Sequence, residues 1–206
     1  MNIHQFVDLF KISYRSTIMD RKIILKQEHR PTKITVFLAS MEDSHIRHLI
    51  KLARDPSLVD LLGWNPSFEP DETEEFTEAI SAFALPYSRK SQPVVFGVYI
   101  DTEDFPVGYA VLKGLNMDLL TAEVGVAILD LEYRSKGFGR LALKRIVQYG
   151  FDELHLKTIG ATILLSNKTS INMTKRTGFA VREIVRDSWP MPDGSMADMV
   201  WMELTR

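Results

Sequence analysis

The sequence predicts a mixed α/β (α+β) domain in which helices flank a mainly antiparallel central sheet. Three short apolar runs, at 94–100, 107–113 and 124–129, are separated by polar turns and indicate an antiparallel meander. A long amphipathic segment at 139–154 precedes a strand-like run at 158–165, which indicates a strand-helix-strand crossover late in the chain. The chain has 206 residues, of which 45% are hydrophobic, and this is enough to bury one substantial core.

The first 32 residues are predicted to form a helical extension, and residues 33–206 the main domain. Apolar side chains recur at helical spacing from Ile3 to Tyr14, and Pro31 interrupts the pattern. This helix either caps the core or contacts a partner subunit, which would make the protein a homodimer. Residues 1–33 carry seven Lys or Arg against three Asp or Glu. Because no nucleic-acid-binding motif accompanies this charge, we interpret it as a solvated surface.

The main domain begins with a strand and two helices and ends with a helix and two strands. The acidic first turn after Pro70 favours the start of the second helix. The elements expected outside the meander and crossover are, in order, a strand at 34–38, a helix from the capping-box-like Ser40-Met-Glu-Asp43 to just before Pro56, a helix from Pro70 to Pro86, a helix at 170–177 ending at Gly178, and strands at 179–186 and 199–204 around an Asp193-Gly194 turn.

The composition argues against several classes of protein. No apolar run reaches the roughly 18 residues of a membrane span, and the N-terminus does not resemble a secretory signal, so we expect no membrane association and a cytoplasmic location. The chain has no cysteine, which rules out disulfides, thiolate metal sites and a cysteine nucleophile. His45 and His48 show no known ligand spacing, so no metal is expected.

The most informative segment is the glycine-containing loop at 133–139, between an apolar run and the long helix. A helix N-terminus presents unpaired N–H groups and partial positive charge, and glycine lets a phosphate approach the backbone closely. Arg134, Lys136 and Arg140 add formal positive charge. The loop therefore favours binding of a phosphate group, although a tight turn that needs glycine only for its dihedral angles would look similar.

A dinucleotide-binding loop is a remote alternative, because Gly137-x-Gly139-x-x-Ala142 also satisfies that pattern. That class of protein requires an acidic residue at the end of the next strand and repeated parallel β-α units. Here the next strand ends in Leu165-Ser166-Asn167, and the loop follows a meander. A P-loop is excluded because the chain has no GxxxxGK[ST] motif.

These residues resemble a known family. Arg134-x-x-Gly137-x-Gly139 is similar to the pyrophosphate loop of the GNAT superfamily of N-acetyltransferases. The segment at 122–129 resembles the fourth strand of that family, and Asn167-x-x-Ser170 through Gly178-Phe179 resembles its second motif. The order of elements from about 34 to 204 is that of the branch containing the RimJ/RimL-like ribosomal-protein N-terminal acetyltransferases.

The resemblance implies that acetyl-coenzyme A (acetyl-CoA) is the co-substrate and that its pyrophosphate binds the loop. In the family the fourth strand splays from the fifth, so that exposed backbone pairs with the pantetheine arm and a main-chain N–H there acts as oxyanion donor. The residue matching Asn167 hydrogen-bonds CoA or the strand gap, and a simple turn residue is the alternative. The cofactor-binding residues implied are Ile128, Leu129, Arg134, Ser135, Lys136, Gly137, Phe138, Gly139, Arg140 and Asn167.

Acetyl transfer by direct attack in a ternary complex needs no covalent enzyme intermediate, which agrees with the absence of cysteine and of a Gly-x-Ser-x-Gly motif. An amine with a pKa near 10 must first lose a proton. Glu123 is the candidate base, or else an exposed charge at a strand end. Thr174 replaces the tyrosine that protonates the thiolate in many relatives. Ser170 is then the candidate acid, or else a helix cap or a surface serine.

The expected function is therefore transfer of acetyl from acetyl-CoA to a primary amine, carried by either a protein N-terminus or a small molecule. Residues 42–78 contain ten acidic against three basic residues, a balance that would attract a cationic acceptor or simply provide a solvated helix start. A non-catalytic acyl-CoA-binding module that has lost the acid is the alternative.

Overall fold

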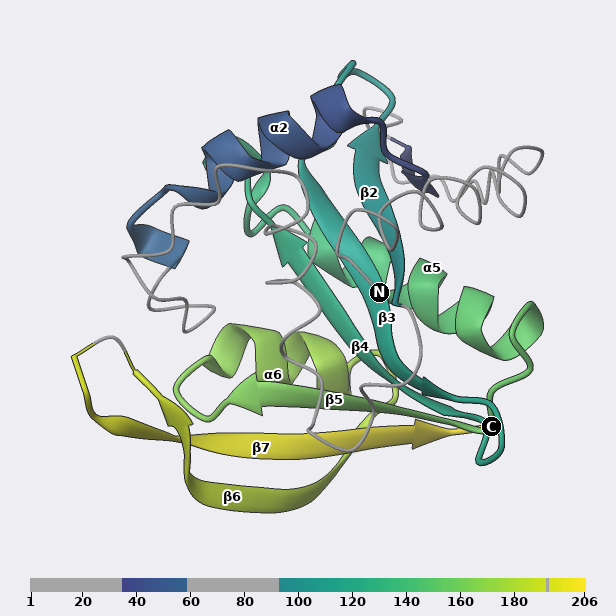
Figure 1. The fold of residues 1–206 in the computed structure, drawn as a ribbon, viewed down its shortest axis with the longest axis vertical. Helices are drawn as coiled ribbons and strands as arrows, with labels where there is room; N and C mark the ends of the chain where they lie inside the picture. The colour runs from purple at the N-terminus through teal and green to yellow at the C-terminus, as the bar shows by residue number, and fades with distance from the viewer. Residues whose placement is uncertain (1–34, 59–92, 192) are drawn as a thin grey trace, which may run out of the picture.

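The computed structural model describes residues 35–58, 93–191 and 193–206. Within them, seven strands form one mixed sheet in the order β1-β2-β3-β4-β5-β7-β6 (Figure 1). The strands are β1 (Val36–Ala39), β2 (Val94–Ile100), β3 (Gly108–Asn116), β4 (Thr121–Ile128), β5 (Thr158–Leu164), β6 (Ala180–Pro190) and β7 (Met196–Thr205). The helices are α2 (Asp43–Ala53), α5 (Phe138–Asp152) and α6 (Lys168–Lys175), and a short 3-10 turn spans Leu131–Tyr133.

The predicted meander and crossover are both present. Strands β1 to β4 pair antiparallel in succession, and α5 connects β4 to the parallel strand β5. β7 then pairs antiparallel with both β5 and β6. The predicted mixed α/β class with a mainly antiparallel sheet is thus confirmed. The expected extension at 1–32 and the expected helix from Pro70 to Pro86 lie outside the described residues.

Helix α2 begins two residues later than Ser40-Met-Glu-Asp43 suggests. Glu42 is the N-cap and forms a reciprocal capping box with His45, whose Nδ1 accepts the Glu42 N–H at 3.2 Å. The Tyr99 hydroxyl lies 3.0 Å from the same nitrogen. His45 therefore has a structural role at the start of a helix.

The sheet has a helix-covered core on each face. Along β3, Leu112 belongs to the apolar cluster that contains Ile146 of α5, whereas its neighbour Val111 belongs to the cluster that contains Leu49 of α2. Because successive side chains of a strand point to opposite faces, α5 covers one face and α2 the other. Leu49, Leu112 and Ile146 are fully buried, and each such side chain contributes about 1.5–3 kcal/mol.

Strands β4 and β5 lie side by side only where they begin. Their parallel pairing covers Thr121 to Glu123 on β4 and Thr158 to Gly160 on β5, and the strands then diverge (Figure 1). β4 remains paired with β3 as far as Ile128, and β5 remains paired with β7 as far as Leu164. The sheet is therefore split in its middle, towards the C-terminal ends of both strands.

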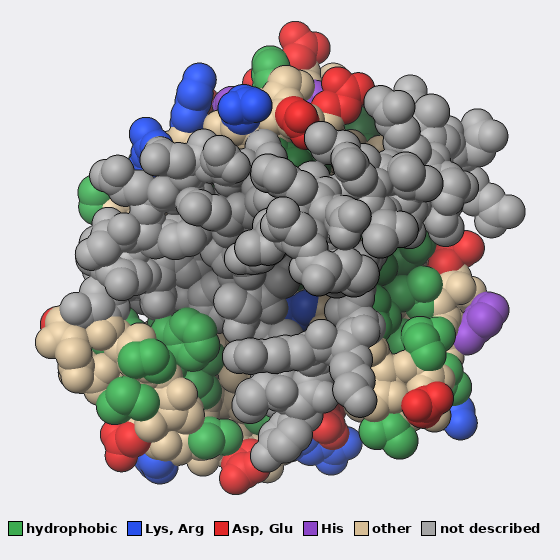
Figure 2. Space-filling model, viewed as in Figure 1, with side chains coloured by type: hydrophobic (Ala, Val, Ile, Leu, Met, Phe, Trp, Pro, Cys, Tyr) green, Lys and Arg blue, Asp and Glu red, His purple; other side chains and the backbone are tan. Residues whose placement is uncertain are grey.

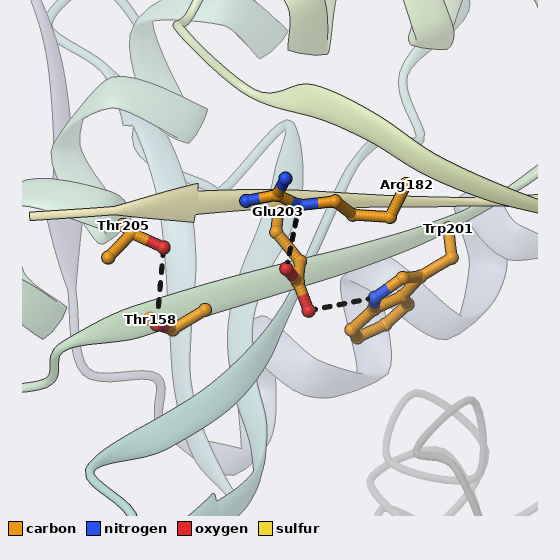
Figure 3. Close-up of polar contacts among 5 residues, drawn as sticks. All are labelled: Thr158, Arg182, Trp201, Glu203 and Thr205. Carbon is orange, nitrogen blue, oxygen red and sulfur yellow. Dashed lines mark hydrogen bonds and ion pairs between the residues drawn. The ribbon is translucent and has the colours of Figure 1, made fainter.

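Trp201 of β7 braces the point where the split begins. Its indole lies across Gly160, where an added Cβ would be 2.1 Å from the ring. Glu203 accepts a hydrogen bond from the Trp201 indole N–H at 3.0 Å and one from Arg182 Nε at 2.9 Å (Figure 3). A glycine at 160 is thus required by the close approach of a neighbouring strand's side chain.

Strand β6 forms one edge of the sheet and is exposed along almost its whole length. Figure 2 shows hydrophobic side chains at the surface over the β6–β7 hairpin, and Ile184, Val185 and Met196 are among the exposed apolar residues. The pairing of β6 with β7 shifts register twice. Such irregularities bend an edge strand and hinder pairing with strands of other molecules.

Candidate active site

The glycine-containing loop ends in an uncapped helix N-terminus. Ser135 and Gly137 have φ angles of 60° and 88°, and Gly137 is the N-cap of α5 without any side-chain hydrogen bond. The N–H groups of the first helical turn have no partner within the helix. Phe138 is buried and packs near the Tyr133 ring, with 5.9 Å between centroids. The helix start is thereby anchored, and its N–H groups and positive dipole end are suited to an anion.

The three basic side chains of the loop lie in different environments. Arg134 donates from Nε to the Ile128 carbonyl at 2.9 Å and from its two terminal nitrogens to the Leu129 carbonyl at 2.7 Å and to Ser57 Oγ at 2.8 Å. Arg134 thus braces the end of β4. Lys136 lies 5.5 Å from the Tyr133 ring centroid and Arg140 is exposed, so these two leave positive charge at the surface of the loop.

Tyr133 is itself fixed by Glu103, which follows β2. Its hydroxyl donates to the Glu103 carboxylate, and this hydrogen bond is the main reason that the pKa of Tyr133 rises to about 12. Tyr133 is therefore neutral at physiological pH, and the face of its ring lies beside the Lys136 ammonium group.

The end of β4 presents the backbone of Ile128, not that of Leu129, to the split in the sheet. The Leu129 N–H donates to the Val107 carbonyl at 2.9 Å and so points toward β3. Backbone groups alternate in direction along a strand, which directs the Ile128 N–H to the opposite side, toward β5. Of the two residues expected to meet the pantetheine arm through their backbone, Leu129 thus has its N–H engaged elsewhere.

A cavity of about 100 Å³ occupies the split between β4 and β5. It is lined by Val126 and Leu143 from the α5 side and by Glu123 and Gly125 from the α2 side. Because these β4 residues alternate between the faces, the cavity reaches both faces of the sheet. The remaining lining residues are Tyr109, Lys113, Val124, Ala161, Thr162, Ile163, Leu164, Asn167, Ser170, Met173, Thr174 and Met199.

Glu123 is buried beside this cavity, so the expectation of an exposed strand-end charge is wrong. Lys113 stands directly opposite on β3, and its Nζ lies 3.4 Å from Glu123 Oε1, with side chains only 4% and 7% exposed. Burial lowers the pKa of Lys113 to about 8, against the opposing effect of Glu123. The two residues form a buried ion pair at the cavity wall.

Helix α6 brings two hydroxyl-bearing residues to the same cavity. Its N-cap is Asn167, whose Oδ1 accepts the Ser170 N–H at 3.0 Å. Ser170 is therefore not the helix cap, contrary to one alternative drawn from the sequence. Ser170 and Thr174 are four residues apart and so share a helix face, and both line the cavity.

Three polar residues of the cavity wall were not predicted as site residues from the sequence. Lys113 and Tyr109 lie on β3, and burial raises the pKa of Tyr109. Thr162 of β5 has a buried hydroxyl without a hydrogen-bond partner among the described residues. A lysine at an inward position of an apolar strand was a detectable signal, because isolated buried lysine is costly.

The described residues contain no group of three His, Cys, Asp or Glu side chains placed to hold a metal ion. In the same part of the chain, no helix is both long enough and apolar enough to cross a membrane.

The family follows from a comparison with known proteins. A family model described as an acetyltransferase (GNAT) domain matches residues 35–180. The chain belongs to the GNAT family. This GNAT protein is therefore an acetyl-CoA-dependent acyltransferase with acetyl-CoA as the implied co-substrate, and the dinucleotide-binding alternative is wrong.

Related proteins agree with this assignment. The uncharacterized N-acetyltransferase p20 of Bacillus licheniformis is 21% identical over 174 residues, which cover 84% of this chain and 93% of that protein. The crystal structure of a spermidine N-acetyltransferase from Vibrio cholerae in complex with CoA and spermine matches with a TM-score of 0.68 at 19% identity, covering 82% of this chain and 95% of that one. A probable acetyltransferase structure matches with a TM-score of 0.65 at 22% identity, covering 86% and 96%. At such identities the solved structures establish a shared fold.

Proposed function

We propose that this GNAT protein acetylates a primary amine that enters the cavity from the α2 face, while acetyl-CoA enters from the α5 face. The observation that carries the proposal is the cavity between β4 and β5, which is lined from both faces of the sheet. A cavity of about 100 Å³ is smaller than the roughly 300–1,000 Å³ of a typical ligand pocket, so we place only the reacting groups of the two substrates in it.

On the α5 face, the loop at 134–140 holds the pyrophosphate. The backbone N–H groups of Phe138 and Gly139 at the uncapped helix start are the main donors, and Lys136 and Arg140 add positive charge. The side chain of Arg134 acts indirectly by holding the end of β4. Asn167 contributes by capping α6.

Inside the cavity, where the two faces of the sheet meet between β4 and β5, the Ile128 N–H is the proposed oxyanion donor for the thioester carbonyl. Glu123 receives and orients the acceptor amine, because its carboxylate is the acidic group lining the cavity on the α2 side. Ser170 supplies the proton to the departing thiolate. The amine attacks the thioester carbon directly, the C–N bond forms, the C–S bond breaks, and one amine proton is finally carried by the CoA sulfur.

A small amine is the acceptor that we propose. The spermidine N-acetyltransferase with bound spermine is a structural neighbour, and the acidic balance of residues 42–78 suits a cation, although much of that segment lies outside the described residues. A protein N-terminus is the second candidate, since Asn167-x-x-Ser170 resembles the RimJ/RimL-like pattern.

The test is an acceptor screen. Release of free CoA from acetyl-CoA is measured with a panel of monoamines and polyamines and with a library of peptides that have free N-termini. We expect saturable release with at least one small amine, and the intact protein mass should stay unchanged after incubation with acetyl-CoA alone. Release with peptides only would assign the second candidate, and no release with any amine would refute the proposal.

A further inference from the structure

The buried ion pair formed by Lys113 and Glu123 raises the question of where the acceptor's proton goes. Both side chains line the cavity, and the Nζ–Oε1 distance is 3.4 Å. Glu123 is also the last β4 residue paired with β5, opposite Gly160, so the pair stands at the point where the sheet splits. An amine that enters the cavity from the α2 face, as proposed, meets a cavity wall that includes this pair.

We propose that Lys113 in its neutral form accepts the proton of the acceptor ammonium, while Glu123 remains a carboxylate throughout. The inference rests on the proposed acetyl transfer and adds the group that removes the proton. The step is R–NH₃⁺ plus Lys113 –NH₂ giving R–NH₂ plus Lys113 –NH₃⁺. The neutral amine then attacks the thioester, and Lys113 returns its proton to solvent after the products leave.

The cost of a net charge in a buried site favours this assignment. With a neutral Lys113, the ammonium and the Glu123 carboxylate cancel before the transfer, and the Lys113 ammonium and the same carboxylate cancel after it. If Lys113 were already protonated and Glu123 took the proton, this pair and the amine together would carry a net positive charge before and after. Net charge in a site whose side chains are 4% and 7% exposed is costly.

Proton affinities point the same way. In solution an alkylammonium ion is about six pKa units less acidic than a carboxylic acid, so a neutral amine is a much better matched acceptor for its proton than a carboxylate is. Burial brings the pKa of Lys113 to about 8, which reduces the mismatch to roughly two units and places the base near the working pH.

Few other titratable groups face Lys113 from the described elements. Tyr109 on the same strand lines the cavity, and burial raises its pKa, so it stays neutral in this range. β5 contributes Thr162, which does not titrate. On β7, Glu203 lies beyond Gly160 and is bound to Arg182 and Trp201.

The decisive variant is Lys113→Arg, because a guanidinium keeps the ion pair with Glu123 but does not lose its proton. With a strongly basic amine at pH 8, we expect kcat to fall by about 100-fold or more, while the Kd of acetyl-CoA stays within about twofold. With an amine that is mostly unprotonated at pH 7, no base is required, and the same variant should approach the wild-type rate.

Wild-type protein supplies a matched readout that needs no variant. Its kcat for a strongly basic amine should rise with pH through an apparent pKa of about 8, the value for Lys113, and this rise should be absent for a weakly basic amine. Equal losses for both amines in Lys113→Arg, an unchanged rate, or a wild-type profile without the difference would each overturn the proposal. Absence of transfer in the wild type with every amine would instead refute the proposed function.

Discussion

The two hydroxyl groups of α6 differ in how well each can serve as an acid. Thr174 is 2% exposed, and its carbonyl accepts hydrogen bonds from the N–H groups of Thr177 and Phe179, so it is fixed in the helix C-terminal turn. Ser170 is only half-buried and lies one turn nearer the helix start. Its backbone, not its side chain, takes part in the cap. The hydroxyl of Ser170 is therefore the more available of the two.

Removing the Ser170 hydroxyl should affect catalysis and not the fold. For Ser170→Ala we expect kcat to fall by about 10- to 100-fold, because the proton is delivered only in the transition state. The Kd of acetyl-CoA, measured by calorimetry, should change less than about twofold. Thr174→Val is the matched control and should leave kcat nearly unchanged. A larger loss in the control would move the acid to Thr174.

At the scale of elements, the site depends on how β4, α5 and α6 meet. Gly139, in the first turn of α5, lies where the three elements converge, since an added Cβ would be 3.4 Å from Met173 Sδ and 3.6 Å from Ile128 Cγ1. Both distances are ordinary van der Waals contacts. The protein itself therefore has room for a methyl group at this position, and the cofactor path that we propose would account for the glycine.

Gly139→Ala should separate stability from binding. Alanine is favoured over glycine in a helix by up to about 1 kcal/mol, so the free energy of unfolding should stay the same or increase slightly in denaturant titrations. The methyl group would occupy the proposed path of the cofactor, and we expect the Kd of acetyl-CoA to rise by about 10-fold or more. Gln148→Ala, at an exposed position of the same helix, is the control for the effect of an added alanine on helix propensity. An unchanged Kd would place the pyrophosphate elsewhere.

At the scale of the whole molecule, the net charge of −2 results from unlike regions, a basic first 33 residues and an acidic segment at 42–78. The folded domain adds a buried cation to this distribution. Lys113 has a folded-state pKa of about 8, below its ordinary 10.5. Between these values, the unfolded chain holds a proton at this residue that the folded protein has released.

The stability of the protein should therefore rise with pH between about 8 and 10.5. The sign follows from linkage, because stability increases with pH wherever the unfolded state binds more protons. The difference between the two pKa values corresponds to at most about 3–4 kcal/mol of stability. Denaturant titrations across this range should show the rise in the wild type and a clearly smaller rise in Lys113→Met. Parallel curves for the two proteins would mean that Lys113 titrates normally.

The sequence by itself determined the strand order of the meander, the crossover through α5 and the position of the glycine-containing loop. These features have local signatures: apolar periodicity along β2, β3 and β4, helical spacing in α5, and glycines at 137 and 139 between two elements. The family resemblance rested on the same contiguous segments, and the match over residues 35–180 confirmed it.

Only the tertiary structure decided which side chains share the cavity. Lys113 and Glu123 meet because β3 and β4 pair in one register, and a shift of one residue would have sent either side chain to the opposite face. The direction of the Leu129 N–H depends likewise on its bond to Val107. The structure likewise shows that Asn167, and not Ser170, caps α6. The Lys113–Glu123 pair and the hydrogen bond from Leu129 to Val107 each join residues from separate segments of the chain. The pattern of residue types along the chain does not show which of these residues will meet.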